Sequence, residues 1–555
     1  MTVDESQRPR QLRWTLYLLL MITSAGAIAG RTLAVSDQNG TTPFLSANDR
    51  SRWAAIRALG DHGSFEIDEI IREVHPVSGR RPWHSIDRVR HRGWDGREHD
   101  YSSKPPLLGT LLAGEYWVVK QFTGASVAER PFLIGRIMLM LSNLLPLIVF
   151  WWVLAKLVER LGVSDWGRGF TMAVATWGTF LSTFAITINN HLPAAVSVLL
   201  ATYYGLRIFR LGRWNDDEPT DWRHYAAAGF FAAFAVTNEL PALSLFALLG
   251  AMLLWKSPMR TIIGYAPAAA VVAAAFWGTN YWAHGTWRPP YTFRSDGPVL
   301  TTVEAHNLAE IAYQMDSGRV PGELAEATAS IGISLSRGTK VTRPRDEFRW
   351  VIWDLDGQDR LAVILDHDRL LIRDWANWYE YPGSYWTEGQ KSGIDQGEPS
   401  RVVYALHVLI GHHGIFSLTP VWLLSVVGGV VWWRRQSADS RGAIDRSGVS
   451  DQRTLTIHRG FVAAAALLSF VCVAFYIARP LVDRNYGGVT SGLRWTFWLI
   501  PLWLICLLPG ADAIADRPWL RRVAYLLLLI SVVSTAYPAL NPWQHPWMYQ
   551  WMMGE

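Results

Sequence analysis

Long apolar runs alternate with polar segments along almost the whole chain. A helix needs about 20 predominantly apolar residues to cross a bilayer. Runs near or above this length predict about eleven crossings: 13–34, 131–155, 168–188, 192–210, 224–238, 240–255, 261–283, 415–433, 459–478, 494–510 and 520–537. The first run follows the basic segment RPRQLR, as in a signal peptide or an uncleaved anchor. Its length and the many later runs favour the anchor.

Basic residues orient these crossings, because Lys and Arg accumulate in short cytoplasmic loops. With the N-terminus in the cytoplasm, every predicted inner loop is basic, and the outer turns at 189–191 and 237–239 carry neither Lys nor Arg. The inner cations are Lys156, Arg160, Arg207, Arg210, Arg213, Lys256, Arg260, Arg434, Arg435, Arg517, Arg521 and Arg522. An odd number of crossings then leaves the C-terminus outside.

Two long segments, 36–130 and 284–414, lie outside under this topology. Within the first, residues 105–121 predict a helix lying at the membrane interface, with Tyr116 and Trp117 as interfacial side chains. Within the second, alternating apolar and polar positions around Asp-Gly predict strands and turns. The loop 435–458, rich in Ser, Asp and Arg, predicts a flexible inner linker.

The expected fold is therefore mainly α, a polytopic transmembrane helical bundle with a small α+β extracytoplasmic subdomain. We expect an N-terminal transmembrane module at 1–283, the outer subdomain at 284–414 and C-terminal transmembrane helices at 415–555.

Composition narrows the class of protein further. Half of the 555 residues are hydrophobic and 30 are tryptophan, which fits a membrane protein. Cys472 and Cys506 both fall inside apolar runs, so a disulfide framework is not expected. The net charge of +5 is modest, and no basic stripe with interleaved aromatics indicates a nucleic-acid partner.

Two candidate residues lie in the first outer segment. Asn48 or Asp49 suits the N-cap of a helix whose apolar face carries Trp53, Ile56 and Leu59. Capping alone explains Asp49, but a helix start also fixes a carboxylate in space for catalysis. Lys104 stands where a polar stretch ends and a rigid Pro105-Pro106 step opens an apolar helix.

Four further candidates flank other spans on the same outer side: His191, Glu239, His412 and Arg494. Each has a simpler explanation. His191 could cap a helix and Glu239 could be a turn residue. His412 could form hydrogen bonds at the membrane interface, and Arg494 could contact lipid headgroups. The His412-His413 pair falls short of the three or four protein ligands that zinc usually takes, so no metal site is predicted. Six candidates on one face nevertheless indicate a functional surface there.

The order of these motifs resembles the polytopic C-superfamily glycosyltransferases (GT-C), especially the bacterial aminoarabinose transferase and protein O-mannosyltransferase branches. In those families an acidic pair opens a helix soon after the first span, and KPPL or HPPL precedes the second. Here Asn48-Asp49 stands at the acidic pair, with one acid missing, and KPPLL begins at Lys104. GGVTSGLRW, which ends at Trp495, resembles a late outer-loop pattern of some bacterial members.

The resemblance implies transfer of a sugar from a polyprenyl-phosphate-linked donor to a lipid, glycan or protein acceptor, with inversion at the anomeric carbon. It implies a bacterial inner membrane and a periplasmic site. Asp49 is then the general base, and Lys104 and Arg494 bind the donor phosphate. Some members use a divalent cation; nothing in this sequence requires one. Sugar or acceptor contacts are expected from His191, Glu239 and His412.

Two other classes of protein remain open. A transporter or lipid flippase usually carries charges deep in its spans and broken helices near the midplane, whereas here polar groups collect at one surface. A non-enzymatic receptor or scaffold could use 284–414 to bind a partner, but this leaves the segment around Lys104 unexplained. The enzymatic interpretation predicts that Asp49 and Lys104 meet in one cavity at the outer leaflet.

Overall fold

The computed structural model describes residues 8–212, 214, 220–304, 307–343, 348–354, 359–387, 390–434 and 448–554. Arg213, Arg435 and the first part of the predicted inner linker, 435–447, lie outside the described residues.

Within the described residues, seven helical segments are long and apolar enough to cross a membrane. They are Pro9–Ala34, Pro131–Leu161, His191–Phe209, Pro258–His284, Thr456–Ala478, Arg494–Ile514 and Pro518–Ala536. In element terms these lie in α1 (Arg8–Ala34), α5 (Pro131–Leu139) to α6 (Leu145–Leu161), α9 (His191–Phe209), α12 (Pro258–Arg260) to α13 (Ala266–His284), α19 (Gly448–Ala478), η10 (Arg494–Leu499) to α20 (Ile500–Ile514), and α21 (Pro518–Ala536). They indicate a multi-pass integral membrane protein.

The four other predicted crossings are helical too, but their helices are shorter. They correspond to α7 (Asp165–Trp177), α10 (Trp222–Asn238), α11 (Leu243–Lys256) and α18 (Leu423–Arg434). The α7 crossing is broken after Trp177 and continues as α8 (Phe180–Phe184). Hydropathy located each helix, whereas its length depended on where the backbone turned.

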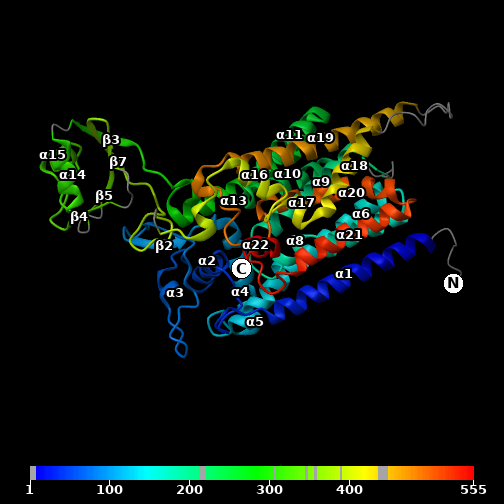
Figure 1. Cartoon of the computed structure of the whole chain (residues 1–555), viewed down its shortest axis with the longest axis horizontal. Coiled ribbons are helices and arrows are strands. Elements are labelled where there is room, and N and C mark those ends of the chain that lie inside the picture. Colours follow the sequence, from blue (N-terminus) through cyan, green and yellow to red (C-terminus); the bar gives the residue numbers. More distant parts are fainter. Residues whose placement is uncertain are drawn as a thin grey trace.

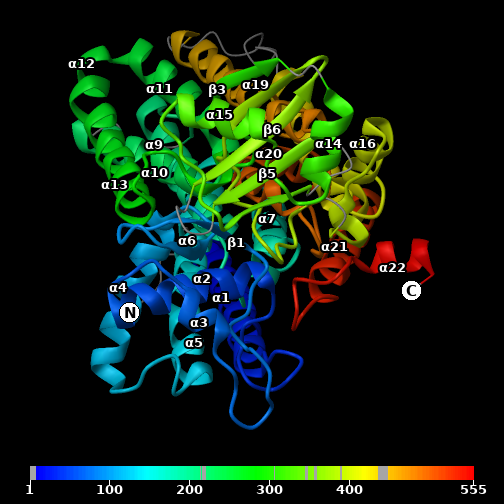
Figure 2. The same ribbon diagram turned by 90° about the vertical axis from the view of Figure 1, so that its left-hand side faces the viewer.

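The helices run along the long axis of the molecule, and the two long polar segments gather at the end opposite the N-terminus (Figure 1). The first segment contributes α2 (Ala47–Arg57), the π-helical turn η1 (Ala58–His62), α3 (Asp68–Arg72), the hairpin β1 (Arg88–Arg92) and β2 (Glu98–Ser102), and α4 (Pro106–Thr123). Figure 2 faces this end, with the five-stranded sheet of the second segment above α2, α3 and α4. The shared placement agrees with the predicted topology.

The second segment forms a small antiparallel sheet of order β3-β7-β6-β5-β4. Its strands are β3 (Val299–Glu304), β4 (Thr339–Thr342), β5 (Arg349–Asp354), β6 (Arg360–Asp366) and β7 (Arg369–Asp374), with helices α14 (Leu308–Asp316) and α15 (Gly322–Ser330). One face packs Trp350 and Ile352 against the two helices. The other packs Val351 and Trp353 against Val89 and Tyr101 of the β1–β2 hairpin. The mainly helical fold with a small sheet is thus confirmed.

Two local predictions were wrong. Ser46, and not Asn48 or Asp49, is the N-cap of α2, because its hydroxyl accepts the Asp49 amide at 3.0 Å. Tyr116 is fully buried and donates its hydroxyl to Asp61 at 2.8 Å, so only Trp117, 55% exposed, suits an interface. α4 turns one face into the core formed with α2, and helical periodicity places Tyr116 on that face.

Candidate active site

Lys104 lies between β2 and α4, where the chain leaves the hairpin. Its Nζ is 3.1 Å from Oδ2 of Asp87, and its backbone amide donates to the Ser102 hydroxyl at 3.3 Å. The Ser51 hydroxyl of α2 lies 2.7 Å from Ser102 Oγ and 2.5 Å from the Asp87 carbonyl oxygen. Pro105 precedes α4 without a side-chain cap. The hairpin, α2 and the start of α4 therefore fix Lys104 together.

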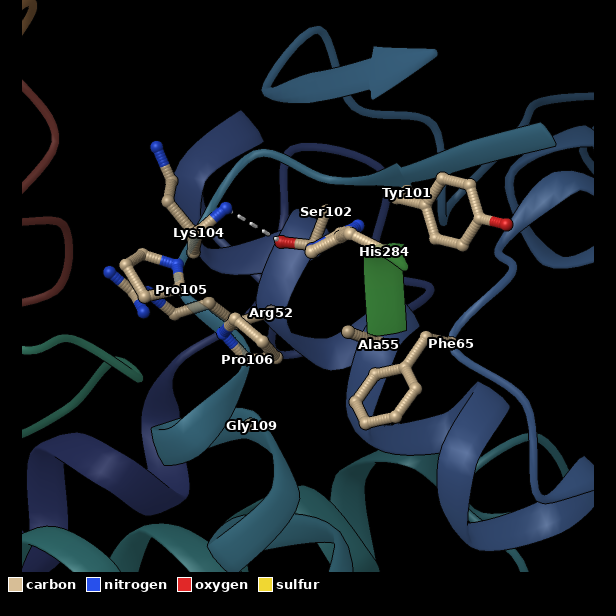
Figure 3. A pocket seen from close by; sticks show the side chains of 10 residues that line it. All are labelled: Arg52, Ala55, Phe65, Tyr101, Ser102, Lys104, Pro105, Pro106, Gly109 and His284. Carbon is tan, nitrogen blue, oxygen red and sulfur yellow. Dashed lines mark hydrogen bonds between the residues drawn. The ribbon is translucent and has the colours of Figure 1, made fainter. Parts of the chain in front are cut away.

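Lys104 lines a pocket of about 400 Å³, part of it open to solvent. Its lining residues are Arg52, Ala55, Phe65, Tyr101, Ser102, Lys104, Pro105, Pro106, Gly109 and His284. In Figure 3 the Lys104 amine and the Arg52 guanidinium point to the same side, away from Phe65 and Tyr101. The pocket thus joins a cationic end to an apolar end.

Three basic side chains, Lys104, Arg52 and Arg494, repel one another near the cationic end of the pocket. Burial lowers the pKa of Lys104 to about 8; the carboxylate of Asp87 opposes this shift, and Arg52 and Arg494 add to it. Burial also lowers the pKa of Arg52 to about 10, again with a contribution from Arg494. Such a cluster favours an anionic ligand that neutralises the cations.

A chain of buried polar contacts joins Arg52 to Arg494. Arg52 Nη2 donates to Asn190 Oδ1 at 2.6 Å, and Asn190 Nδ2 donates to Glu239 Oε1 at 2.7 Å. The same Glu239 oxygen pairs with His191 Nδ1, and Arg494 Nη1 is 2.8 Å from His191 Nε2. Glu239 and His191 are 5% and 1% exposed. The two turns around 190 and 238, both predicted to be outer turns, therefore meet the start of η10 at Arg494.

The loop before η10 positions the Arg494 guanidinium. Its Nε and Nη2 donate to the Gly487 carbonyl at 3.2 and 2.7 Å, and its Cζ lies 5.1 Å from the centre of the Trp543 ring. Tyr486, Gly487 and Gly488 all have positive φ, of 58°, 94° and 76°. A Cβ on Gly487 would come 3.0 Å from Arg494 Nε, so glycine permits this close approach.

Asp49 lies one helical turn before Arg52 but faces another way. Its Oδ2 accepts the Leu45 amide at 3.0 Å and its Oδ1 accepts the Ile188 amide at 3.1 Å. Burial raises the pKa of Asp49 to about 6, against these amide bonds. Among the described residues no hydrogen bond or ion pair joins Asp49 to Lys104, and Asp49 is not among the pocket's lining residues.

The structure therefore gathers Lys104, His191, Glu239 and Arg494, whereas the Asp49 carboxylate does not line the Lys104 pocket, so the predicted meeting of Asp49 and Lys104 in one cavity is not observed. His412 lies elsewhere, in a cluster with His407, His413 and Tyr486, where His412 and His407 stack with ring centres 3.9 Å apart. His412 and His413 are 2% and 0% exposed, so neither is an interfacial residue.

Arg52 and Asp87 are site residues that sequence reasoning missed. Arg52 lies on the helix predicted around Asp49, but spacing gave no usable signal, because the two side chains face different ways in the structure. Asp87 gave no signal, because only folding of the hairpin brings it to Lys104. In the part of the chain that the structure describes, no group of three or more His, Cys, Asp or Glu side chains could hold a metal ion.

Comparisons with known proteins show a distant structural likeness. No family model matches the chain, and no curated protein matches it. Among solved structures it is similar to the oligosaccharyltransferase of Archaeoglobus fulgidus in its apo form, with 12% identity and a TM-score of 0.38. The match covers 94% of this chain and 55% of that one, so this chain spans about half the length of that protein.

Proposed function

We propose that the protein is a membrane glycosyltransferase that moves a sugar from a polyprenyl-phosphate-linked donor to an acceptor at the outer face of the membrane. The observation that carries the proposal is the pocket at Lys104, where two cations meet apolar walls beside a membrane span. The motif order around Asp49 and Lys104, which resembles GT-C enzymes, supports the same chemistry.

Donor binding follows from the charges. The donor phosphate sits between Lys104 and Arg52, and Arg494 is a third cation close enough to act on Lys104. Arg presents a forked pair of donors to phosphate oxygens, whereas Lys presents a compact charge. The lipid chain leaves along the apolar wall that Phe65 and Pro106 line. Contacts to the sugar or acceptor are assigned to His191 and Glu239, and His412 acts at most from a distance.

The reaction is a single displacement. The acceptor hydroxyl or amine attacks the anomeric carbon, the bond from that carbon to the phosphate oxygen breaks, and polyprenyl phosphate leaves with the electron pair. A carboxylate takes the acceptor proton, a contribution worth about 10²–10⁴-fold in rate. Bound orientation of both substrates supplies much of the remainder. The cations stabilise the charge that develops on the leaving phosphate.

Two carboxylates are candidates for the base. Asp49 is the residue that the motif resemblance selects, and its raised pKa suits a base, but both of its oxygens accept backbone amides. Asp87 reaches the pocket directly through its contact with Lys104. We retain Asp49 as the proposed base and treat Asp87 as its competitor.

Paired variants decide between them. We expect Asp49→Asn to lower transfer of radiolabelled sugar from polyprenyl phosphate by at least about 10²-fold, while Asp87→Asn mainly weakens donor binding through Lys104. The measurement is kcat and donor KM in membranes holding equal amounts of each variant. Full kcat in Asp49→Asn with loss in Asp87→Asn transfers the role to Asp87.

Lys104→Ala tests the donor site separately. Its donor KM is expected to rise with little change in kcat at saturation, and Lys120→Ala, on the same segment but outside the pocket, serves as the control. An unchanged donor KM in Lys104→Ala contradicts the phosphate role. Donor that crosses the membrane without bond exchange contradicts the enzyme and supports a transporter.

A further inference from the structure

A second cavity lies away from the Lys104 pocket, beneath the His412-His413 turn. It encloses about 320 Å³ of empty space, part of it open to the surroundings. Its lining residues are Phe180, His413, Gly414, Ile415, Leu418, Thr419, Trp422, Leu493, Thr496, Phe497, Ile500 and Trp503. We refer to it as the His413 cavity.

The lining is apolar and carries no Asp, Glu, Lys or Arg. Its hydroxyls and one indole are already engaged: Thr419 and Thr496 donate to Ile415 and Leu493 carbonyls at 2.8 Å, and Trp503 Nε1 donates to Ser469 at 2.9 Å. Because an unpaired charge is costly to bury in such surroundings, an occupant of this cavity is uncharged.

Among these lining residues, His413 carries a polar atom that is not engaged. Its side chain is fully buried, and its Nε2 has no hydrogen-bond partner among the described residues. The Thr490 carbonyl lies near enough to act on the ring, but does not complete a hydrogen bond to Nε2. The other ring nitrogen, Nδ1, lies 2.5 Å from His412 Nδ1. A buried polar atom without a partner is costly, so a ligand group is expected at Nε2.

The chemistry of that group follows from the histidine pair. One proton lies between the two Nδ1 atoms. If His413 carries it on Nδ1, its Nε2 is an acceptor. If His412 carries it, the neutral His413 ring has its proton on Nε2, which is then a donor. An alcohol satisfies both cases, because a hydroxyl both donates and accepts. A methyl ether can only accept, and an alkane can do neither.

We propose that the His413 cavity binds a neutral lipid alcohol, with its chain against the apolar walls and its hydroxyl on Nε2 of His413. The walls include η10 and α20, part of a candidate membrane span, so the ligand arrives from the bilayer. Phe497 lines this cavity and also packs on the His191 ring, with centres 5.9 Å apart. Phe497 therefore lies between an occupant of the His413 cavity and the His191 ring, and the occupant does not enter the Lys104 pocket.

The test uses the purified full chain in detergent and a diazirine-bearing farnesol as the probe. We expect saturable crosslinking to peptides that contain Trp422 or Phe497. Unlabelled farnesol should compete about 5–10-fold better than farnesene, a hydrocarbon that can neither donate nor accept, the gain of one hydrogen bond. Leu418→Trp, which fills the cavity, should abolish the saturable signal.

Two histidine variants locate the hydrogen bond. His413→Phe keeps a ring but should remove the preference for the alcohol, while His407→Phe, in the same cluster but outside the cavity, should leave it unchanged. If His413→Phe fails to fold, the alcohol-to-hydrocarbon ratio of the unmodified chain decides alone.

Equal competition by hydrocarbon and alcohol overturns the proposal. So does farnesyl phosphate competing as well as farnesol, since this assigns the cavity to the donor lipid, or labelling that survives Leu418→Trp. The assay measures binding without turnover, so its outcome is independent of the proposed transferase activity.

Discussion

At the scale of single residues, the balance of charge in the buried cluster is the main feature. Arg52, Lys104 and Arg494 act on one another, and among the described residues Glu239 and Asp87 are the carboxylates that most directly face them. Each cation is partly compensated, and Lys104 keeps a pKa low enough to titrate near neutrality. The cluster is therefore built to gain from an added anion and is sensitive to loss of either carboxylate.

The pH profile follows from two of these groups. A base role for Asp49, with its pKa raised to about 6, requires the ionised form, so kcat/KM for the donor should fall as pH drops through about 6. Lys104, with its pKa lowered to about 8, should lose phosphate affinity as pH rises through about 8. A bell-shaped profile between these values is expected.

Lys104→Arg isolates the alkaline side of that profile. Guanidinium remains charged, so the alkaline limb should move to higher pH while the acidic limb stays in place. An unmoved alkaline limb shows that another group titrates there.

A variant of Glu239 tests whether this carboxylate balances the charges of Arg52 and Arg494. Glu239→Gln removes the carboxylate between His191 and Asn190 and leaves Arg52 and Arg494 less compensated. Loss of one partner from a buried ionic network costs about 3–5 kcal/mol. Thermal unfolding in detergent should report this loss, whereas the exposed Glu310→Gln should leave the transition unchanged; equal stability of both variants contradicts a charge-balancing role.

At the scale of elements, glycines decide how closely two helices pack. A Cβ on Gly428 of α18 would collide with the Cys506 carbonyl oxygen of α20, and one on Gly510 would collide with the Leu424 carbonyl oxygen. The two backbones touch here, as is common where small residues line a membrane helix interface. α20 directly follows η10, which begins at Arg494, so this contact helps to place the loop before η10.

Gly428→Ala should therefore separate α18 from α20 and destabilise the fold by about 1–3 kcal/mol, as overpacking does. The adjacent Gly429→Ala is the matched control, because its Cβ meets only the Val462 side chain at 3.4 Å. Unfolding in detergent should distinguish the two variants, and similar stabilities contradict the close contact.

At the scale of the whole molecule, both long polar segments occupy one end of the bundle and the N-terminus lies at the other (Figure 1). The sheet packs on the β1–β2 hairpin, and the hairpin leads directly to Lys104. The five-stranded sheet with its helices thus supports the pocket as well as covering one end of the bundle. The division of the chain at 283 and 414 stays a prediction.

Sidedness can be measured with single cysteines. Ser78→Cys, in the first outer segment, should react with a membrane-impermeant maleimide in intact cells, and Met259→Cys, in a predicted inner loop, should react only after lysis. Native Cys472 and Cys506 are buried and give a low background. The reverse pattern places the Lys104 pocket in the cytoplasm and contradicts an outer-face transferase.

Local pattern was enough to predict the helices, the shared side of the polar segments and the strands of the second segment. Hydropathy, basic loops and alternation depend only on neighbouring residues, so the sequence reveals them directly. The candidates at Lys104, His191, Glu239 and Arg494 were found in the same way, because each stands at the end of an apolar run.

Tertiary structure alone decided which of these residues meet. His191 and Arg494 are 303 positions apart, Asp87 reaches Lys104 through the hairpin, and the Asp49 carboxylate turns to the amides of Leu45 and Ile188. The reason is physical: hydropathy assigns a residue to a depth in the membrane, but its partners and the direction of its side chain depend on how distant elements pack.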